Sequence, residues 1–228
     1  MAKKIEKAII LLNTKNTDIL KLKKKYERIY TGSFFCENIM PDLKEIETLF
    51  KKGIKNISIQ TSFLTNNNIK RIKIELSEIL YNFDNVEILI NDLGLLDFLN
   101  NNYPDVKKGI GIPLSYDFMR MDISSLNSFM MRNRLYIIET DEDYLVDNIK
   151  KRDFLLSFRS TLKFVGVSRF CPWTRKIIGK CNFECKKYVK ELRIKGNDKK
   201  MILWENAYFS KREKKSVRNF DRHVNICL

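Results

Sequence analysis

The sequence predicts an α/β fold, and three observations support this prediction. Short apolar segments typical of buried parallel strands alternate with longer segments whose apolar residues repeat at helical spacing. The chain has 228 residues, 44% of them hydrophobic, so it can bury a substantial core. No segment is rich in Pro, Gly or Ser, which favours a single domain over residues 1–228. Alternation of this kind predicts a parallel sheet with helices outside it.

The expected strands are short and rich in β-branched or aromatic residues. In order along the chain, we predict strands at residues 7–12, 28–35, 56–60, 86–90, 106–112, 134–138 and 162–167. Pro41 begins one of the helices between them and Gly53 ends it, at positions where these residues are favoured. The other predicted helices are 17–26, 66–80, 95–101, 115–131 and 141–150.

This order of elements is typical of a (β/α) barrel like that of triosephosphate isomerase. A closed eightfold barrel usually takes about 250 residues, so we expect an incomplete or distorted barrel here. Residues 188–194 and 201–204 have the pattern of a hairpin, and residues 211–222 are strongly basic. We therefore expect residues 186–228 to form a small, basic C-terminal β extension.

The chain is strongly basic, with 43 Lys and Arg against 28 Asp and Glu and a net charge of +15. Such an excess attracts anionic partners, and RNA is one candidate. A solvated basic surface that reflects only compositional bias is an equally open interpretation. No apolar run approaches the roughly 20 residues that span a bilayer, and no signal peptide is recognisable. We therefore expect a cytoplasmic protein without a membrane span.

Three of the five cysteines lie close together, and they suggest the chemistry of the protein. Cys181 and Cys185 are four residues apart, so one helical turn would place both sulfurs on the same face. Cys171 and the distant Cys36 each follow a predicted strand, and in a barrel such positions gather at the C-terminal face. In a reducing cytosol a cysteine cluster is more often metal-binding or catalytic than disulfide-bonded.

Four thiolates suit a [4Fe–4S] cluster, which is usually held by four cysteines. Zinc also accepts four cysteines, but its structural sites usually contain paired short C-x₂₋₄-C motifs. This chain has one C-x₃-C motif and two more distant cysteines, so Cys36, Cys171, Cys181 and Cys185 fit a cluster better. Zinc remains the alternative, and the four could also be ordinary buried cysteines, which behave as small hydrophobic residues.

Four further residues are candidates for substrate binding. Arg169 and Arg175 flank Cys171, where they could stabilise thiolates or bind an anionic small molecule. Asn91 and Asp92 follow a predicted strand, where they could bind a ligand or simply cap the next helix. We favour the cap, and the sequence identifies no catalytic residue.

His223 is the only histidine in the chain. A lone histidine near a basic terminus is usually a surface residue, although it could bind zinc together with Cys227. Because the chain has only one histidine, a Cys–His or Ser–His nucleophile pair has almost no residue available as its base.

The chain resembles a known family in two respects. Residues 87–96 contain an Asn-Asp-Leu-Gly motif and are followed by a helix, by Tyr103-Pro104 and by a short strand near residues 109–111. An early cysteine also precedes a late C-x₉-C-x₃-C pattern. In these features residues 7–190 resemble the collagenase-like peptidase family, and above all its anaerobic ubiquinone-hydroxylation branch. The first gap of the late pattern is shorter here than in that branch.

The resemblance implies a barrel-like fold with an oxygen-sensitive [4Fe–4S] cluster on Cys36, Cys171, Cys181 and Cys185. It also implies oxygen-independent hydroxylation, or a related modification, of a small aromatic substrate or an RNA base. Members sometimes act as heterodimers of related proteins, so the resemblance makes such a protein a candidate partner here. Peptidase activity is not expected, since the chain has a single histidine and no identifiable nucleophile.

Overall fold

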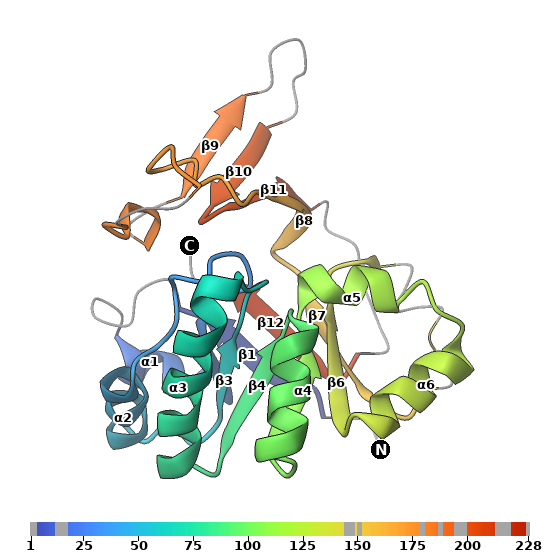
Figure 1. Ribbon diagram of the computed structural model, residues 1–228. Helices are drawn as coiled ribbons and strands as arrows, with labels where there is room; N and C mark the ends of the chain where they lie inside the picture. Colours follow the sequence, from blue (N-terminus) through green and yellow to red (C-terminus); the bar gives the residue numbers. More distant parts are fainter. Residues whose placement is uncertain are drawn as a thin grey trace.

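The computed structural model describes residues 4–11, 18–143, 149, 152–177, 181–186, 189–193, 200–212 and 220–226. Its main feature is a closed barrel of eight strands, shown in Figure 1. These strands are β1 (Glu6–Ile10), β2 (Arg28–Gly32), β3 (Ile57–Gln60), β4 (Val86–Ile90), β5 (Lys107–Ile110), β6 (Leu135–Thr140), β7 (Leu155–Arg159) and β12 (Arg222–Ile226). Neighbouring strands follow the order β1-β12-β7-β6-β5-β4-β3-β2, and every pair is parallel.

The predicted α/β barrel class is confirmed, and the barrel is closed rather than incomplete. Strand β12 completes it, because Arg222 pairs with Glu6 of β1 on one side and with Ser157 of β7 on the other. Neither β7 nor β12 was expected from the sequence. Both carry charged or polar residues among their apolar ones, as in Leu-Leu-Ser-Phe-Arg, and this mixture hides the pattern of a buried strand.

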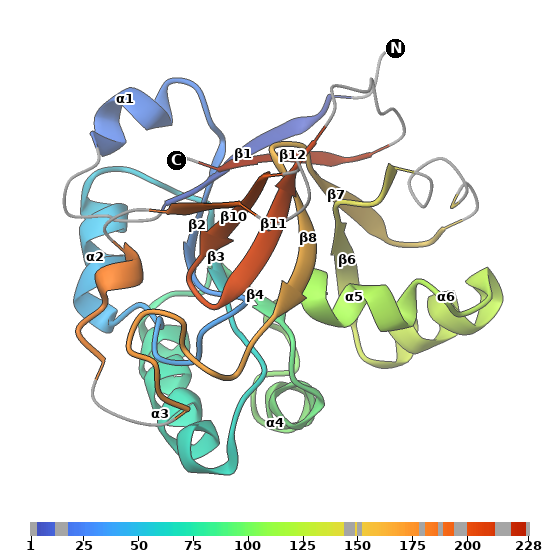
Figure 2. The same cartoon turned by 90° about the horizontal axis from the view of Figure 1, so that it is seen from above.

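Six helices are described, and they lie around the outside of the barrel (Figure 2). They are α1 (Ile19–Lys23), α2 (Leu43–Lys51), α3 (Asn66–Asn82), α4 (Leu93–Asn102), α5 (Ile112–Phe118) and α6 (Ile123–Arg132). The single helix expected at 115–131 is two helices, because the Asp122 side chain accepts a hydrogen bond from the Ser125 amide and begins α6. Most of the helix expected at 141–150 lies outside the described residues.

The barrel strands separate two hydrophobic cores. Alternate residues point inward or outward along a strand, so Ile10 and Tyr30 fill the barrel interior while Ile9 and Ile29 pack against the helices. All four side chains are buried. Burial of each large aliphatic or aromatic side chain contributes about 1.5–3 kcal/mol, so both cores stabilise the fold strongly.

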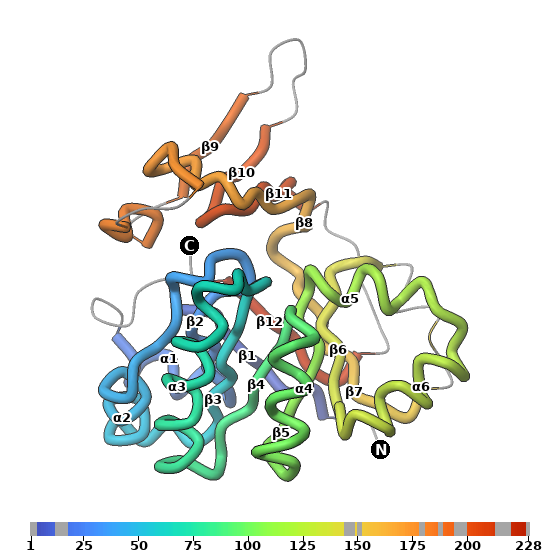
Figure 3. The backbone as a smooth tube through the Cα atoms, viewed as in Figure 1, coloured from blue at the N-terminus to red at the C-terminus, as the bar shows by residue number. Residues whose placement is uncertain are grey.

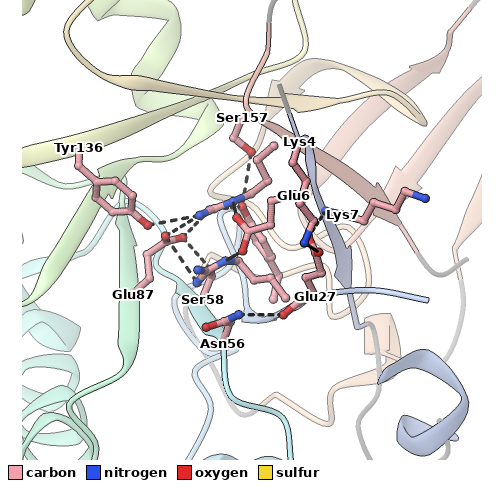
Figure 4. A network of polar contacts seen from close by, with 12 residues as sticks. Lys4, Glu6, Lys7, Glu27, Asn56, Ser58, Glu87, Tyr136 and Ser157 are labelled. Carbon is pink, nitrogen blue, oxygen red and sulfur yellow. Dashed lines mark hydrogen bonds and ion pairs between the residues drawn. The ribbon is translucent and has the colours of Figure 1, made fainter. Parts of the chain in front are cut away.

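An ion network closes the N-terminal end of the barrel interior (Figure 4). Arg222, the first residue of β12, donates to both carboxylate oxygens of Glu87 at 2.7 and 2.9 Å. Arg28, the first residue of β2, donates to Glu6 at 2.8 Å and lies 3.6 Å from Glu87. Tyr30 also accepts from Arg222, at 2.9 Å. Two buried arginines and two carboxylates therefore neutralise one another at this end.

A second sheet covers the C-terminal end of the barrel, as the ribbon views and the backbone trace agree (Figures 1, 2 and 3). Its antiparallel strands are β8 (Leu162–Val167), β9 (Lys190–Arg193), β10 (Lys200–Trp204) and β11 (Ala207–Lys211), in the order β8-β11-β10-β9. The expected hairpin is confirmed as β9 and β10, although its turn at 194–199 lies outside the described residues. We call these four strands the inserted sheet, because they lie between barrel strands β7 and β12. The small β region is thus an insertion, and residues 222–226 of the expected extension belong to the barrel.

Candidate functional site

The structure brings Cys36 close to Cys185, although the two are far apart in sequence. Cys36 lies in the loop after β2, and Cys185 lies in a short 3₁₀ helix, η1 (Glu184–Lys186). Both side chains are buried in one small apolar cluster with Ile39, and Trp173 packs against that cluster. Cys171 and Cys181 are half-buried, and all four are free thiols. The loop after a barrel strand and the segment after β8 therefore meet at the same place.

Burial and neighbouring charges act together on the pKa values of the two buried thiols. Burial raises the pKa of Cys36 to about 12, and the Glu205 carboxylate and the Cys181 and Cys171 thiols add to this effect. Burial also raises the pKa of Cys185, and Glu205 and the other three thiols act in the same direction. Cys36 and Cys185 are therefore protonated at neutral pH, and any metal that they bind must displace their protons.

The described residues show no preformed site for a metal ion. Among the residues that the structure describes, no three or more His, Cys, Asp or Glu side chains are placed so that they could hold a metal ion. A zinc ion needs its sulfurs about 2.3 Å from a single point. A [4Fe–4S] cluster is larger and gives each cysteine its own iron, so its thiolates stand further apart. The described residues thus favour neither donor set over the other, and the four cysteines are candidate ligands by residue type alone.

Glu205 connects the inserted sheet to both cysteine-bearing loops. It lies in the turn between β10 and β11 and is buried there with a positive φ of 54°. Its carboxylate accepts a hydrogen bond from Ser33 Oγ, and its backbone carbonyl accepts one from Trp173 Nε1 at 2.7 Å. Burial raises the pKa of Glu205 to about 7. No pattern in the sequence pointed to this residue, because both of its partners are remote along the chain.

Arg169 and Arg175 are both exposed in the segment around Cys171. The Arg175 amide donates to the Cys171 carbonyl at 2.8 Å, and the Cys171 amide donates to the Lys176 carbonyl at 2.9 Å. These bonds fold residues 171–176 into a tight turn, in which Arg175 has a φ of 57°. The two guanidinium groups are accordingly accessible to an anionic partner beside the cysteines.

The side chains of Asn91 and Asp92 form hydrogen bonds with backbone groups around the C-terminal end of the barrel. Asn91 is fully buried, donates to the Thr61 carbonyl at 2.7 Å and accepts from the Leu114 amide at 3.0 Å. Asp92 accepts from the Leu95 amide at 3.0 Å and so caps α4, which confirms the cap interpretation. The second Asp92 oxygen accepts from the Leu64 amide at 3.3 Å, so both side chains hold loops in place.

A further group of buried polar side chains at this end was not expected from the sequence. Arg159, the last residue of β7, is 1% exposed, and its guanidinium lies over the Phe34 ring at 4.6 Å. It approaches Glu139 to 3.2 Å, yet none of its three nitrogens makes a hydrogen bond to the described part of the chain. Gln60 Nε2 and Trp204 Nε1 are buried without an acceptor as well. Such donors are rare in proteins, and they distinguish this end of the barrel from the other.

A small recess lies beside Cys36. Its lining includes Ser33, Cys36 and Gln60. It is a shallow hollow with no enclosed space large enough for a water molecule. It places Gln60, with its unpaired amide nitrogen, at the same opening as the cysteine.

The imidazole of His223 contacts a serine hydroxyl, and such a pair can serve as a nucleophile and its base. Its Nε2 lies 2.6 Å from Ser160 Oγ, and burial lowers the pKa of the imidazole. Within the described residues no carboxylate orients the other ring nitrogen, and a Ser–His–Asp triad requires such a group. The pair therefore does not support a peptidase.

No family model matches the chain, and a search of curated proteins finds no match either. In the part of the chain that the structure covers, no helix is long and apolar enough to cross a membrane. What the protein does must therefore be inferred from its own residues.

Proposed function

We propose that the protein is a [4Fe–4S] protein with Cys36, Cys171, Cys181 and Cys185 as the cluster ligands. One observation carries this proposal: Cys36, from a barrel loop, packs in one apolar cluster with Cys185 of the segment that follows β8. The group also sits at the C-terminal end of a parallel (β/α) barrel, where enzymes with this fold build their active sites. Zinc on the same four cysteines, in a non-catalytic scaffold, is the alternative.

The reaction that we propose is oxygen-independent hydroxylation, or a related modification, of a small aromatic substrate or an RNA base. The resemblance of the cysteine pattern and of the Asn-Asp-Leu-Gly segment to the collagenase-like peptidase family supports it. A heterodimer with a related protein and a cytoplasmic location belong to the same proposal. When bound, an iron–sulfur cluster supplies one-electron redox chemistry.

The residues around the cysteines suit such a cluster. Cys36 and Cys185 are buried, so they would shield their side of the cluster from water. Trp173 covers the same apolar cluster, and Lys190 Nζ lies 4.3 Å from the centre of its ring. Cations in this position offset the negative charge of a thiolate-bound cluster. Arg169 and Arg175 are placed to attract an anionic substrate to the same face.

Anaerobic purification followed by metal analysis tests the proposal. We expect a brown protein with about four irons and four sulfides per chain. Cys36→Ser should lose most of the iron, whereas Cys227→Ser, the matched control outside the ligand set, should keep it. A colourless protein without iron would refute the cluster, and one zinc per chain would favour the scaffold.

A second candidate function is RNA binding. The net charge of +15 supports it, as do exposed basic residues on the inserted sheet and beside Cys171, namely Arg169, Arg175, Lys176, Lys190, Arg193 and Lys200. Contacts with phosphates release counterions, so binding should weaken steeply with salt.

Filter binding of tRNA over a salt series tests this second function. The double variant Arg169→Glu, Arg175→Glu should reduce the salt slope by about one for each phosphate that the variant no longer binds. The control, Lys44→Glu with Lys51→Glu, changes two exposed lysines of α2 and should leave the slope unchanged. Retention that does not depend on salt would exclude RNA binding of this kind.

A further inference from the structure

The Ser33 hydroxyl makes every hydrogen bond that a serine side chain can make. Its oxygen accepts from the Phe35 amide at 2.9 Å and from the Cys36 amide at 3.0 Å. Its single proton is donated to the Glu205 carboxylate. A hydroxyl has one donor and two acceptor positions, so the carboxylate decides how this hydroxyl is oriented. The backbone of Cys36 is therefore held in a serine turn that depends on Glu205.

Glu205 also reaches the other cysteine-bearing segment. Its carbonyl accepts from the indole of Trp173, two residues after Cys171. The next residue, Asn206, accepts through its carbonyl from the Ser168 amide at 2.9 Å. One turn of the inserted sheet thus contacts the loop of Cys36 through a side chain and the segment of Cys171 through the backbone.

The backbone conformation of Glu205 is unusual. A φ of 54° is the left-handed region, which residues other than glycine seldom adopt. Glu205 and Asn206 form the two-residue turn between the paired residues Trp204 and Ala207, and turns of this kind need a positive φ at their first central residue. The turn presents the Glu205 side chain to Ser33 and its carbonyl to Trp173. A carboxylate is also an unfavourable neighbour for thiolates, because like charges repel. Its place among four cysteines is therefore explained by geometry rather than by charge stabilisation.

We propose that Glu205, acting through Ser33, is a positioning residue that sets the place of Cys36 relative to Cys171 before any metal binds. The consequence for iron depends on the cluster proposed above, whereas the positioning itself can be measured in the iron-free protein. The inserted sheet is then part of the metal site as well as a cover for the barrel. Cys36 comes from the barrel, so its distance from the other thiols depends on this contact.

Alkylation of the iron-free protein, resolved for each cysteine by peptide mass spectrometry, tests the positioning. Cys36 should react more slowly than the half-buried Cys171 in the unaltered chain. Ser33→Ala and Glu205→Ala should each speed the alkylation of Cys36 about tenfold to a hundredfold, the factor that corresponds to a hydrogen bond with a charged partner. Ser33→Ala removes a single oxygen, so the chain should still fold.

Two further variants separate positioning from other effects. Because the Glu205 carboxylate also raises the pKa of Cys36, the rates compared are those of the Cys36 thiolate, obtained from a pH series for each variant. Glu205→Gln keeps an accepting oxygen but removes the charge, so it should retain the slow alkylation of this thiolate. Glu87→Gln alters a buried carboxylate at the opposite end of the barrel, and it should leave the ratio of Cys36 to Cys171 alkylation unchanged. If Glu205→Gln behaved like Glu205→Ala, the effect would be one of charge and the inference would be wrong. A changed alkylation ratio in Glu87→Gln would mean that general destabilisation of the fold exposes Cys36. That result would also overturn the inference.

Anaerobic reconstitution with iron and sulfide gives the second readout. We expect Glu205→Ala and Ser33→Ala to bind less iron or to change the electron paramagnetic resonance spectrum of the reduced protein, and Glu205→Gln to match the unaltered chain. Normal iron content and spectrum in both alanine variants would overturn the link to the cluster. If the unaltered chain binds no iron, the proposed function fails, while the alkylation result still decides whether Glu205 positions Cys36.

Discussion

The two ends of the barrel interior differ in how completely their buried charges are paired. At the N-terminal end, both carboxylate oxygens of Glu87 accept from Arg222, and Arg28 and Glu6 complete the network (Figure 4). At the C-terminal end, Arg159 lies beside Glu139 but makes no hydrogen bond within the described residues.

The difference places the well-paired charges at one end of the barrel and the proposed cysteine site at the other. Burial opposes the ionisation of Glu87, but Arg222 and Arg28 outweigh it and hold the pKa of this carboxyl below its usual range. Burial raises the pKa of Glu139, and Arg159 only partly offsets it. In barrels of this class the N-terminal face maintains the fold while the C-terminal face carries the site, and unmet polar groups are typical of functional regions.

The largest effect should follow from breaking the N-terminal network. Arg222→Met leaves Glu87 buried beside a single, more distant arginine, and we expect a loss of about 3–5 kcal/mol in the free energy of unfolding. Urea unfolding measures it. The exposed Arg169→Met is the control and should change stability by less than about 0.5 kcal/mol. Equal effects of the two variants would mean that the network does not stabilise the barrel.

The pH dependence of stability should have opposite signs at the two ends. The pKa of Glu205 rises from 4.5 to about 7 through burial, so the folded chain keeps a proton that the unfolded chain loses. The contribution of Glu205 to the free energy of unfolding is fully present below pH 4.5. It is lost as the pH rises to about 7, and the loss is about 3 kcal/mol. The pKa of Glu87 is lowered, so its contribution is present above its usual pKa of 4.5 and is lost as the pH falls.

Urea unfolding of the iron-free protein across this pH range checks the signs. Glu205→Gln should remove the loss of stability between pH 4.5 and 7, whereas Glu87→Gln should remove part of the loss in acid. If Glu205→Gln left the pH profile unchanged, its carboxyl would have an ordinary pKa and the contrast between the two ends would be smaller than proposed.

The smallest effect should come from replacing the poorly bonded pair. A buried ion pair without good hydrogen bonds adds little, so Arg159→Met combined with Glu139→Gln should change the free energy of unfolding by less than about 1 kcal/mol. The same measurement applies. A loss as large as that of Arg222→Met would show that the C-terminal pair is as important for stability as the N-terminal network.

Much of the fold could be predicted because it depends on local patterns. The apolar runs around Ile9 and Ile88 and the helical spacing in residues 66–80 reflect periodicities that short windows of sequence contain. Strands β7 and β12 were not predicted, because their residues Arg159 and Arg222 are charged and yet point into the barrel. A short segment of sequence does not reveal the partners that make a buried charge acceptable.

The candidate site, too, could be predicted from the sequence only in part. By itself the sequence determined the α/β barrel class and the four cysteines proposed as ligands, because residue type and spacing express these directly. Only the tertiary structure decided that β12 closes the barrel, that Cys36 lies with Cys185, and that Glu205 contacts both cysteine-bearing loops. These contacts join residues far apart along the chain, and a hydrogen bond between such residues depends on where the folded backbone brings them together rather than on any local pattern.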